Sequence, residues 1–428
     1  MALMVDGFGR QSQTAIFRAG ASGITPDIPT RWSSLVETAH RAMSLDAWAY
    51  VHGSSGIEST AEANARAFER WRIVPRMLRD VSERDLGVAL FGHRYPTPLL
   101  ASPVGVLELV HPDADVAIAR AAGSLGVPTI LSNQASISME RVASESAGAP
   151  LWFQLYWSTS DELVESLVGR AEKLGVQAIV VTVDTQMLGW RPRDLDRAFL
   201  PFIHGMGIAQ YTSDPVFRRL VAERMGRPAD PDAPRPRVTP AAIRTLIGMA
   251  RRYPGRLGAN LRSGEPRAAV ETFLDVFSRA DLSWENLAFL RSRTTLPILL
   301  KGIQHPDDAR RALESGVDGV IVSNHAGRQV DGAIASLDAL PGVVEAVAGR
   351  APVLMDSGVR GGADIVRALA LGAAAVCVGR PWVYGMAIAG EHGARDVLRN
   401  FIAEFDLTLG LSGHRSVGEL SSEDLVER

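Results

Sequence analysis

Eight short apolar segments recur along this chain of 428 residues, and their alternation with helical patterns constrains the fold more than any other feature. Each segment is rich in Val, Ile and Leu without strict alternation of polar residues, which is typical of parallel strands buried on both faces. The predicted strands are residues 98–105, 128–132, 151–156, 178–184, 297–302, 319–324, 352–358 and 375–380. This alternation predicts an α/β protein with a TIM (β/α)8 barrel formed by residues 97–428. Residues 1–96 would then be a helical N-terminal segment packed on the barrel.

One connection is far longer than the others. Roughly 110 residues separate the fourth predicted strand from the fifth, where one helix and its turns need about 20–30. We expect residues 192–285 to form an insertion that covers the active site as a lid, because long insertions after a barrel strand are usually functional. A disordered surface insertion is the alternative. Residues 226–240, rich in Pro and charge, predict a flexible or extended segment.

Composition excludes several classes of protein. The net charge is −3 and no block of Lys and Arg is present, which argues against nucleic acid as a partner. A single cysteine, Cys377, excludes internal disulfides and any metal site built from several cysteines, so no metal centre is expected. The first 18 residues lack the apolar core of a signal peptide, and no apolar run reaches the roughly 18 residues of a membrane span. We therefore expect a cytoplasmic protein that does not associate with a membrane.

Reactive side chains occur where the predicted strands end. In a TIM barrel the active site is built at these positions. They hold Gly105, Ser132, Gln154, Tyr156, Asp184, Lys301, His325, Asp356 and Arg380. A purely structural rim would carry Asn, Ser, Gly and Asp as turn residues. The Tyr, Lys, His and Arg side chains therefore predict a catalytic site.

The last two strand ends predict a phosphate site. Residues 356–364 read DSGVRGGAD, and residues 378–381 read VGRP. Barrels often bind phosphate between these two loops, because small residues let backbone N–H groups approach the anion. Arg360 and Arg380 could add the neutralising charge. The alternative is a glycine-rich turn and a surface cation with no ligand.

His325, in the segment SNHAGRQ, is the candidate general base. Asp184, two strands away around the barrel, could orient it and stabilise its cation. Arg191 and Arg328 could hold a substrate carboxylate through bidentate hydrogen bonds. Each residue alone has a structural alternative, because single histidines are more often satisfied polar groups and single arginines are more often in salt bridges. Their joint placement favours the catalytic interpretation.

Several segments together resemble one enzyme family. They are WFQLY, VTVDTQMLGWRPRDL, LLKGIQHPDDAR, SNHAGRQVDG, and DSGVRGGADIVRALALGA with VGRP. From about Trp48 to nearly the C-terminus, the chain is similar to the FMN-dependent 2-hydroxy acid oxidases and dehydrogenases. Within that family, GWRPRDL, YTSDPVF and KGIQHPDDARRA most resemble lactate 2-monooxygenase.

The resemblance implies a role for each candidate residue. His325 would remove a proton from the substrate, and Asp184 would support its cationic form. Tyr50 would help the two arginines to hold the carboxylate, and Tyr156 would hydrogen-bond the oxygen that becomes a ketone. Lys301 would stabilise negative charge on the reduced flavin. The other implied FMN contacts are Pro103, Val104, Gly105, Ser132, Gln154, Thr182, Ser323, Asp356, Gly358, Arg360, Gly379 and Arg380.

Two residues depart from the family pattern. Ala326 follows His325 where the family usually has Gly, and Gln134 stands where an apolar or aromatic residue is common. We hypothesise that Gln134 lines the substrate pocket and favours a longer or hydroxylated acid over plain lactate. A neutral replacement is an equally open interpretation.

The resemblance implies oxidation of a small L-2-hydroxy acid to the 2-keto acid with oxygen as acceptor. A closed lid that delays release of the keto acid would lead to oxidative decarboxylation in the site. The alternatives are an oxidase that releases hydrogen peroxide and a dehydrogenase with a quinone or protein acceptor. A different FMN barrel, such as an isopentenyl diphosphate isomerase, and a flavin-binding protein without catalysis are more remote. The resemblance also implies a homo-oligomer, a tetramer or an octamer.

Overall fold

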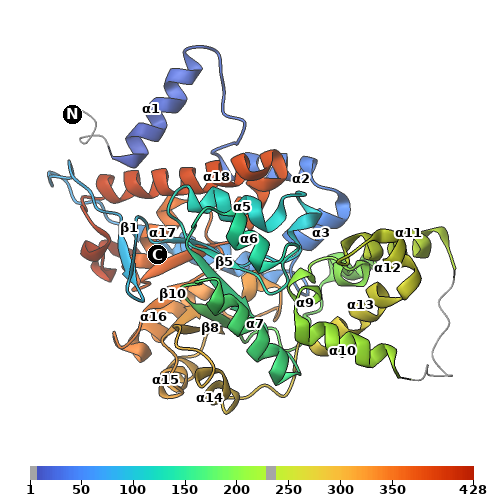
Figure 1. The fold of residues 1–428 in the computed structure, drawn as a ribbon. Coiled ribbons are helices and arrows are strands. Elements are labelled where there is room, and N and C mark those ends of the chain that lie inside the picture. Colours follow the sequence, from blue (N-terminus) through green and yellow to red (C-terminus); the bar gives the residue numbers. More distant parts are fainter. Residues whose placement is uncertain (1–6, 228–237) are drawn as a thin grey trace.

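A closed barrel of eight parallel strands forms the centre of the computed structural model, which describes residues 7–227 and 238–428 (Figure 1). Around the barrel the order is β10-β11-β4-β5-β6-β7-β8-β9. The strands are β4 (Leu99–Ala101), β5 (Thr129–Leu131), β6 (Leu151–Leu155), β7 (Ile179–Thr182), β8 (Ile298–Ile303), β9 (Gly319–Val322), β10 (Val353–Met355) and β11 (Ala375–Val378). The predicted TIM barrel is confirmed, and each predicted strand is present.

Side chains from every strand fill the lower part of the barrel. A buried apolar cluster takes at least one residue from each strand: Leu100, Ile130, Trp152, Val180, Leu299, Ile321, Leu354 and Cys377. A hairpin of β2 (Val88–Leu90) and β3 (His93–Tyr95) packs against this cluster through Leu90 and Tyr95. Because the interior is filled in this way, open space remains only towards the carboxyl ends of the strands.

Helices on the outside cover the barrel (Figure 1). They are α5 (Ala114–Gly123), α6 (Met139–Glu145), α7 (Asp161–Lys173), α14 (Asn286–Arg291), α15 (Pro306–Glu314), α16 (Ser336–Val347), α17 (Gly362–Ala370) and α18 (Arg380–Leu411). Their apolar faces meet strand residues that point outwards, such as Leu99 and Ile179, in the main hydrophobic core. None of the helices in the described parts of the chain is long and apolar enough to cross a bilayer.

Four helices precede the barrel: α1 (Phe8–Gly20), α2 (Trp32–Ala42), α3 (Leu45–His52) and α4 (Ser59–Arg70). The first two pack against α18. Helix α3 contacts α8 (Pro192–Asp196), and α4 contacts the 3-10 turn η3 (His325–Gly327). Strand β1 (Trp71–Ile73) then pairs with β12 (Leu425–Glu427) near the C-terminus. The N-terminal region therefore reaches the same end of the barrel as His325.

The long connection between β7 and β8 is mostly helical in its described parts. It contains α8, η2 (Pro201–His204), α9 (Ala209–Thr212), α10 (Pro215–Met225), α11 (Pro240–Arg252), α12 (Leu257–Ser263) and α13 (Glu265–Val276). In Figure 1, α10 to α13 lie together on one side of the barrel. Phe202, Tyr211 and Phe273 form an aromatic centre, with ring centroids 4.8–5.0 Å apart between Phe273 and the other two. Of the segment 226–240 predicted to be flexible, residues 228–237 lie outside the described residues.

Candidate functional site

A cavity of about 530 Å³ lies at the carboxyl ends of the barrel strands. Its volume is in the range of small-molecule and cofactor sites. Most of the residues predicted from the sequence line it: Tyr50, Pro103, Val104, Gly105, Gln134, Gln154, Tyr156, Arg191, Lys301, His325, Arg328, Asp356, Gly358, Arg360, Gly379 and Arg380. The structure thus brings together residues that are up to 330 positions apart in the sequence, from Tyr50 to Arg380.

Ser132, Thr182, Asp184 and Ser323 do not line the cavity, but each hydrogen-bonds a residue that does. Ser132 Oγ donates to Gln154 Oε1 at 2.9 Å, and Gln154 Nε2 donates to Thr182 Oγ1 at 2.9 Å. Ser323 Oγ accepts from Lys301 Nζ at 2.8 Å. In this structure the three hydroxyl groups hold Gln154 and Lys301 in position, and the direct flavin contacts assigned to them remain predictions.

His325 and Asp184 form a hydrogen-bonded pair. Asp184 Oδ1 lies 2.8 Å from His325 Nδ1, and Thr185 Oγ1 donates to the same oxygen at 2.9 Å. Since Asp184 engages Nδ1, the other ring nitrogen, Nε2, is left without a hydrogen bond to the described residues. His325 lines the cavity, so this nitrogen is the one that can exchange a proton with a ligand.

Burial and neighbouring charges set the protonation of this pair. Burial lowers the pKa of His325 below its ordinary value, against the opposing effect of Asp184, and the cations Lys301 and Arg191 lower it further. Burial alone would raise the pKa of Asp184, but His325 and Lys301 outweigh it and the pKa is lowered. At neutral pH the pair is therefore a neutral imidazole beside a carboxylate, which is the state that a general base requires.

The loop after β9 holds His325 in a strained conformation. His325 and Ala326 both have φ of 55°, in the left-handed region that costs about 1–3 kcal/mol for residues other than glycine. Two hydrogen bonds stabilise this conformation: Ala326 N donates to Ser357 Oγ at 2.9 Å, and Ala326 O accepts from Ser54 Oγ at 3.2 Å. The usual Gly at this position suits such a φ. Ala326 keeps the same loop shape by means of these contacts.

Arg191 and Arg328 lie together at the mouth of the cavity. Arg191 Nε donates to the carbonyl of Arg328 at 3.2 Å, and Arg328 Nη1 donates to the carbonyl of Tyr50 at 2.6 Å. The Arg328 guanidinium also lies over the Tyr50 ring, 5.0 Å from its centroid. Burial, with the charge of Arg328, lowers the pKa of Arg191 to about 10, so it stays cationic at neutral pH. Arg191 Nη1 and Arg328 Nε and Nη2 make no hydrogen bond to the described residues, which leaves donors for a carboxylate.

Lys301 places a buried positive charge beneath the cavity. Its Nζ lies 3.0 Å from Asp356 Oδ2, and the two side chains are only 4% and 10% exposed. Burial by itself would lower the pKa of Lys301, but Asp356 and Asp184 raise it above its ordinary value. The ammonium group is therefore charged at all physiological pH values. The pairing in β8 shifts register between Lys301 and Ile303, and such irregularities re-aim side chains beside active sites.

An anion can be held at the far end of the cavity. Helices α17 and α18 begin there, after Gly361 and Gly379, and neither N-terminus is capped by a side chain. Uncapped N–H groups and the helix dipole favour a phosphate, and Arg360 adds charge beside them. Gly358 has φ of 90°, and a Cβ there would lie 2.6 Å from the carbonyl of Asn64. Only glycine therefore lets this loop pass so close to α4.

Residues 39–427 match the family described as FMN-dependent dehydrogenase. The chain belongs to the FMN-dependent dehydrogenase family. It is 41% identical over 412 residues to the FMN-dependent alpha-hydroxy acid dehydrogenase qulF of Penicillium citrinum, covering 96% of this chain and 94% of that protein. It is 40% identical to the L-lactate oxidase of Lysinibacillus sphaericus (strain C3-41), with 93% of each chain covered. The crystal structure of mandelate oxidase with (S)-4-hydroxymandelic acid matches with a TM-score of 0.75 and 33% identity over 94% of this chain and 99% of that one.

The cavity fits FMN, the cofactor of this family. Lys301 supplies a buried cation at the cavity wall, and the uncapped helix ends with Arg360 offer donors that would suit a phosphate. Ser102 Oγ is buried without a hydrogen bond, and this residue also lines the cavity. An orphaned buried hydroxyl in a polar cavity is expected where a ligand group completes the hydrogen bonding.

Arg380 makes hydrogen bonds to the protein in addition to the phosphate contact that the sequence predicts. Its Nε donates to the carbonyl of Val51 at 3.0 Å and its Nη1 to that of Ala326 at 3.2 Å. Its Nη2 donates to the carbonyl of Gly53 and to Ser54 Oγ, both at 2.9 Å. Most of its donors thus join α3 to the His325 loop. A direct contact with the phosphate stays a prediction, and the charge of Arg380 still favours an anion nearby.

Several residues of the site escaped the sequence analysis of this FMN-dependent dehydrogenase. Ser54, Ser102 and Ser357 are common turn residues, so nothing in the sequence marked them. Gln329 directly follows a predicted arginine, and its Oε1 accepts from Arg191 Nη2 at 3.0 Å. Its place in the segment HAGRQ was the only available signal.

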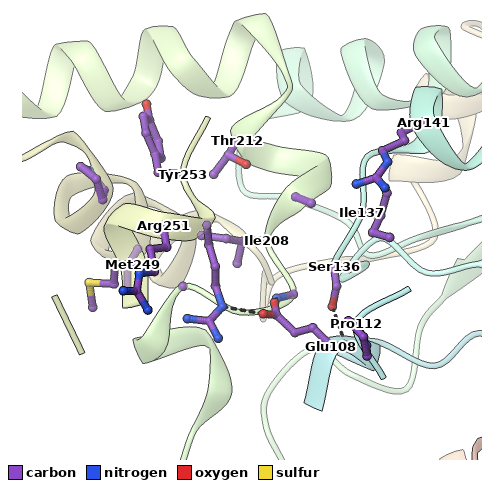
Figure 2. Close-up of a pocket in the computed structure, with 16 residues that line it drawn as sticks. Glu108, Pro112, Ser136, Ile137, Arg141, Ile208, Thr212, Met249, Arg251 and Tyr253 are labelled. Carbon is purple, nitrogen blue, oxygen red and sulfur yellow. Dashed lines mark hydrogen bonds and ion pairs between the residues drawn. The ribbon is translucent and has the colours of Figure 1, made fainter. Parts of the chain in front are cut away.

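A second cavity, of about 380 Å³, lies between the barrel and the insertion (Figure 2). Glu108, in the turn η1 (Leu107–Leu109) that follows the Gly105 loop, forms an ion pair with Arg252 of α11 at 2.5 Å. Glu108 also accepts a hydrogen bond from Gly207 N at 3.3 Å. None of the predicted site residues lines this second cavity. We call this set of contacts the Glu108 clasp, and it ties the insertion to a loop of the first cavity.

Proposed function

We propose that this protein oxidises a small L-2-hydroxy acid to the 2-keto acid. The observation that carries the proposal is the convergence of the His325–Asp184 pair, the Arg191–Arg328 pair and Lys301 on one cavity. A carboxylate beside a carbon that bears a hydroxyl group is the ligand that such a set can bind and deprotonate. The names of the relatives, L-lactate oxidase and alpha-hydroxy acid dehydrogenase, support the same substrate class.

In the proposed mechanism the two arginines bind the substrate carboxylate and thereby orient C2. His325 Nε2 takes a proton from the substrate, and Asp184 stabilises the imidazolium that forms. Burial raises the pKa of Tyr156 to about 12, so its hydroxyl stays protonated and can donate to the substrate oxygen. FMN, when bound, accepts the two electrons that leave C2.

Anaerobic mixing with 2-hydroxy acids tests the reaction directly. L-lactate, L-mandelate and glycolate would be mixed with the FMN-loaded protein, and the flavin absorbance would be followed. Reduction by at least one of them at a rate that saturates with concentration is expected. A flavin that stays oxidised with every acid of the panel would overturn the proposal in favour of a binding protein.

We further propose that oxygen is the acceptor and that the keto acid is decarboxylated before it leaves, as in lactate 2-monooxygenase. Residues of the insertion segment, Arg193 and Phe202, line the cavity, and Phe202 is fully buried, which supports slow product release. Lactate and oxygen would give pyruvate and hydrogen peroxide, and their reaction in place would give acetate, carbon dioxide and water. Measuring acetate against free peroxide separates this outcome from that of a simple oxidase. Reduction of a quinone or protein acceptor in preference to oxygen would instead identify a dehydrogenase.

The protonation of His325 predicts the pH dependence of the reaction. The base must be neutral, so kcat/KM should rise with pH and level off above the pKa of His325. Because burial lowers this pKa, the midpoint is expected below 6.5. Asp184→Asn removes the group that raises the pKa, so the midpoint should move lower still while the plateau falls. A midpoint that rises in this variant would contradict the assigned role of Asp184.

The Glu108 clasp predicts how release and decarboxylation are coupled. Arg252→Ala removes the ion pair and should loosen the insertion, so that more pyruvate and peroxide escape. We expect the ratio of peroxide to acetate to rise by up to about fivefold, because a partly exposed ion pair contributes at most about 1 kcal/mol. Arg244, on the same helix, forms no ion pair with any residue that the structure describes, so Arg244→Ala serves as the matched control. An equal rise in both variants would show that the clasp is not responsible.

We also propose a homo-oligomer, in line with the sequence expectation of a tetramer or an octamer. Ile57, Met187, Trp190 and Val330 are 64–86% exposed. Their loops are joined by hydrogen bonds, because Gly56 N donates to the carbonyl of Trp190 and Gln329 Nε2 donates to that of Met187. Exposed apolar groups that gather in this way commonly mark an interface. Sedimentation velocity of the purified protein tests this, and a monomer at micromolar concentration would refute it. A cytoplasmic location remains a prediction from the sequence.

A further inference from the structure

Gln134 presents an unpartnered amide to the candidate active site. The residue lies after β5, lines the main cavity and is only 7% exposed. Its backbone is fully engaged, because Gln134 N donates to Ser132 Oγ at 3.1 Å and Gln134 O accepts from Val106 N at 2.9 Å. Its side-chain Oε1 and Nε2 make no hydrogen bond to any residue that the structure describes. The amide is therefore available to a ligand, and a ligand that covers it without pairing with it would incur a desolvation cost.

Hydrogen bonds hold the backbone of the loop that carries Gln134. Ser136 Oγ accepts from Glu108 N at 3.1 Å, and Figure 2 shows these two residues side by side in the second cavity. Ser136 N and Ile137 N both donate to the buried carboxylate of Asp115, at 2.8 and 3.0 Å. These contacts fix the backbone from which the Gln134 side chain extends, and so limit the positions that its amide can reach.

Four of the polar side chains of the cavity already have proposed ligands. The arginine pair serves the carboxylate, and His325 with Tyr156 serves the hydroxyl group on C2. The cavity wall also includes Phe202 and Leu188, whose side chains have no hydrogen-bonding group. What remains for the amide is the substituent of the substrate beyond C2.

We propose that Gln134 is a specificity-determining residue that selects 2-hydroxy acids whose side chain bears a neutral hydrogen-bonding group, such as a second hydroxyl. This inference rests on the proposed function. The methyl group of lactate would leave the amide unpaired, whereas a hydroxyl on C3 or C4 would accept from Nε2 or donate to Oε1. A site built to hydrogen-bond a substrate group discriminates strongly against the analogue that lacks it, because its own buried group is left unpaired.

Matched pairs of acids test the selection. L-glycerate is compared with L-lactate, and L-2,4-dihydroxybutanoate with L-2-hydroxybutanoate, by anaerobic flavin reduction. We expect kcat/KM to favour the hydroxylated acid by about tenfold or more in at least one pair. Binding of hydroxypyruvate and pyruvate to the oxidised protein, measured by calorimetry, should give a similar ratio of Kd without turnover.

Two variants connect the preference to the amide. Gln134→Met keeps the length of the side chain and removes the amide, so the ratio should fall to about one or invert. Gln177→Met, at the other end of the barrel where Gln177 Oε1 accepts from Tyr95, should leave the ratio unchanged.

The results that would contradict the proposal can be distinguished from one another. If no acid reduces the flavin, the proposed function fails. If the flavin is reduced but both pairs give ratios near one, or Gln134→Met keeps the preference, the selection by Gln134 is refuted. A ratio unchanged in Gln134→Met together with a weaker Kd for FMN would assign the amide to the cofactor and refute it equally.

Discussion

Replacing His325 with glutamine is expected to slow anaerobic flavin reduction by about 10²–10⁴-fold, the usual contribution of a positioned general base. The imidazole supplies a nitrogen that is neutral at physiological pH and is oriented by Asp184 at 2.8 Å. Glutamine keeps a polar side chain of similar length but cannot take up a proton. Stopped-flow absorbance with saturating L-lactate, or the best acid of the panel, measures the effect.

The variant must retain its cofactor for this result to bear on catalysis. The ratio of flavin to protein absorbance checks that FMN remains bound. His93→Gln, in the hairpin at the other end of the barrel, is the matched control and should react at the wild-type rate. If His325→Gln stays within threefold of wild type while loaded with FMN, another group is the base.

Replacing Lys301 with methionine is expected to lower the free energy of unfolding by about 3–5 kcal/mol. Lys301 Nζ and Asp356 Oδ2 are 3.0 Å apart, and both side chains are buried. Removing one partner of a buried ion pair leaves the other charge uncompensated in a medium that solvates it poorly. Urea denaturation followed by circular dichroism, at a fixed excess of FMN, measures the loss.

A second substitution separates the charge from the packing. Adding Asp356→Asn to Lys301→Met removes the isolated carboxylate, so the double variant should recover a large part of the lost stability. Two contacting groups are expected to be non-additive in this way. If the double variant is as unstable as the sum of both single variants, the ion pair does not account for the loss.

The barrel was predictable because its evidence is local in the chain. Strands such as 298–303 and 179–182 are buried on both faces, so each reads as a continuous apolar run that needs no knowledge of its neighbours. The rule that active sites form at the carboxyl ends of barrel strands then located His325, Lys301 and Asp356. The pairing of His325 with Asp184 followed from strand order alone, since β7 and β9 flank β8.

Contacts between distant segments were not predictable in the same way. Arg380 was expected to serve a phosphate, yet its donors meet carbonyls of Val51, Gly53 and Ala326. Every residue type has a backbone carbonyl, so nothing in the sequence shows which carbonyls will accept a hydrogen bond from Arg380. The Glu108 clasp is similar, because Glu108 and Arg252 are 144 positions apart and both resemble ordinary surface charges.

By itself the sequence determined the architecture and, through the family resemblance, the cofactor, since apolar runs and family motifs are properties of short segments. Only the tertiary structure decided which polar groups have hydrogen-bond partners within the protein and which do not. Gln134 illustrates the difference: its backbone is hydrogen-bonded, whereas its amide, at the cavity wall, makes no hydrogen bond to any residue that the structure describes. Hydrogen-bond satisfaction depends on the closure of the whole barrel, which brings residues from distant parts of the chain within 3 Å of one another.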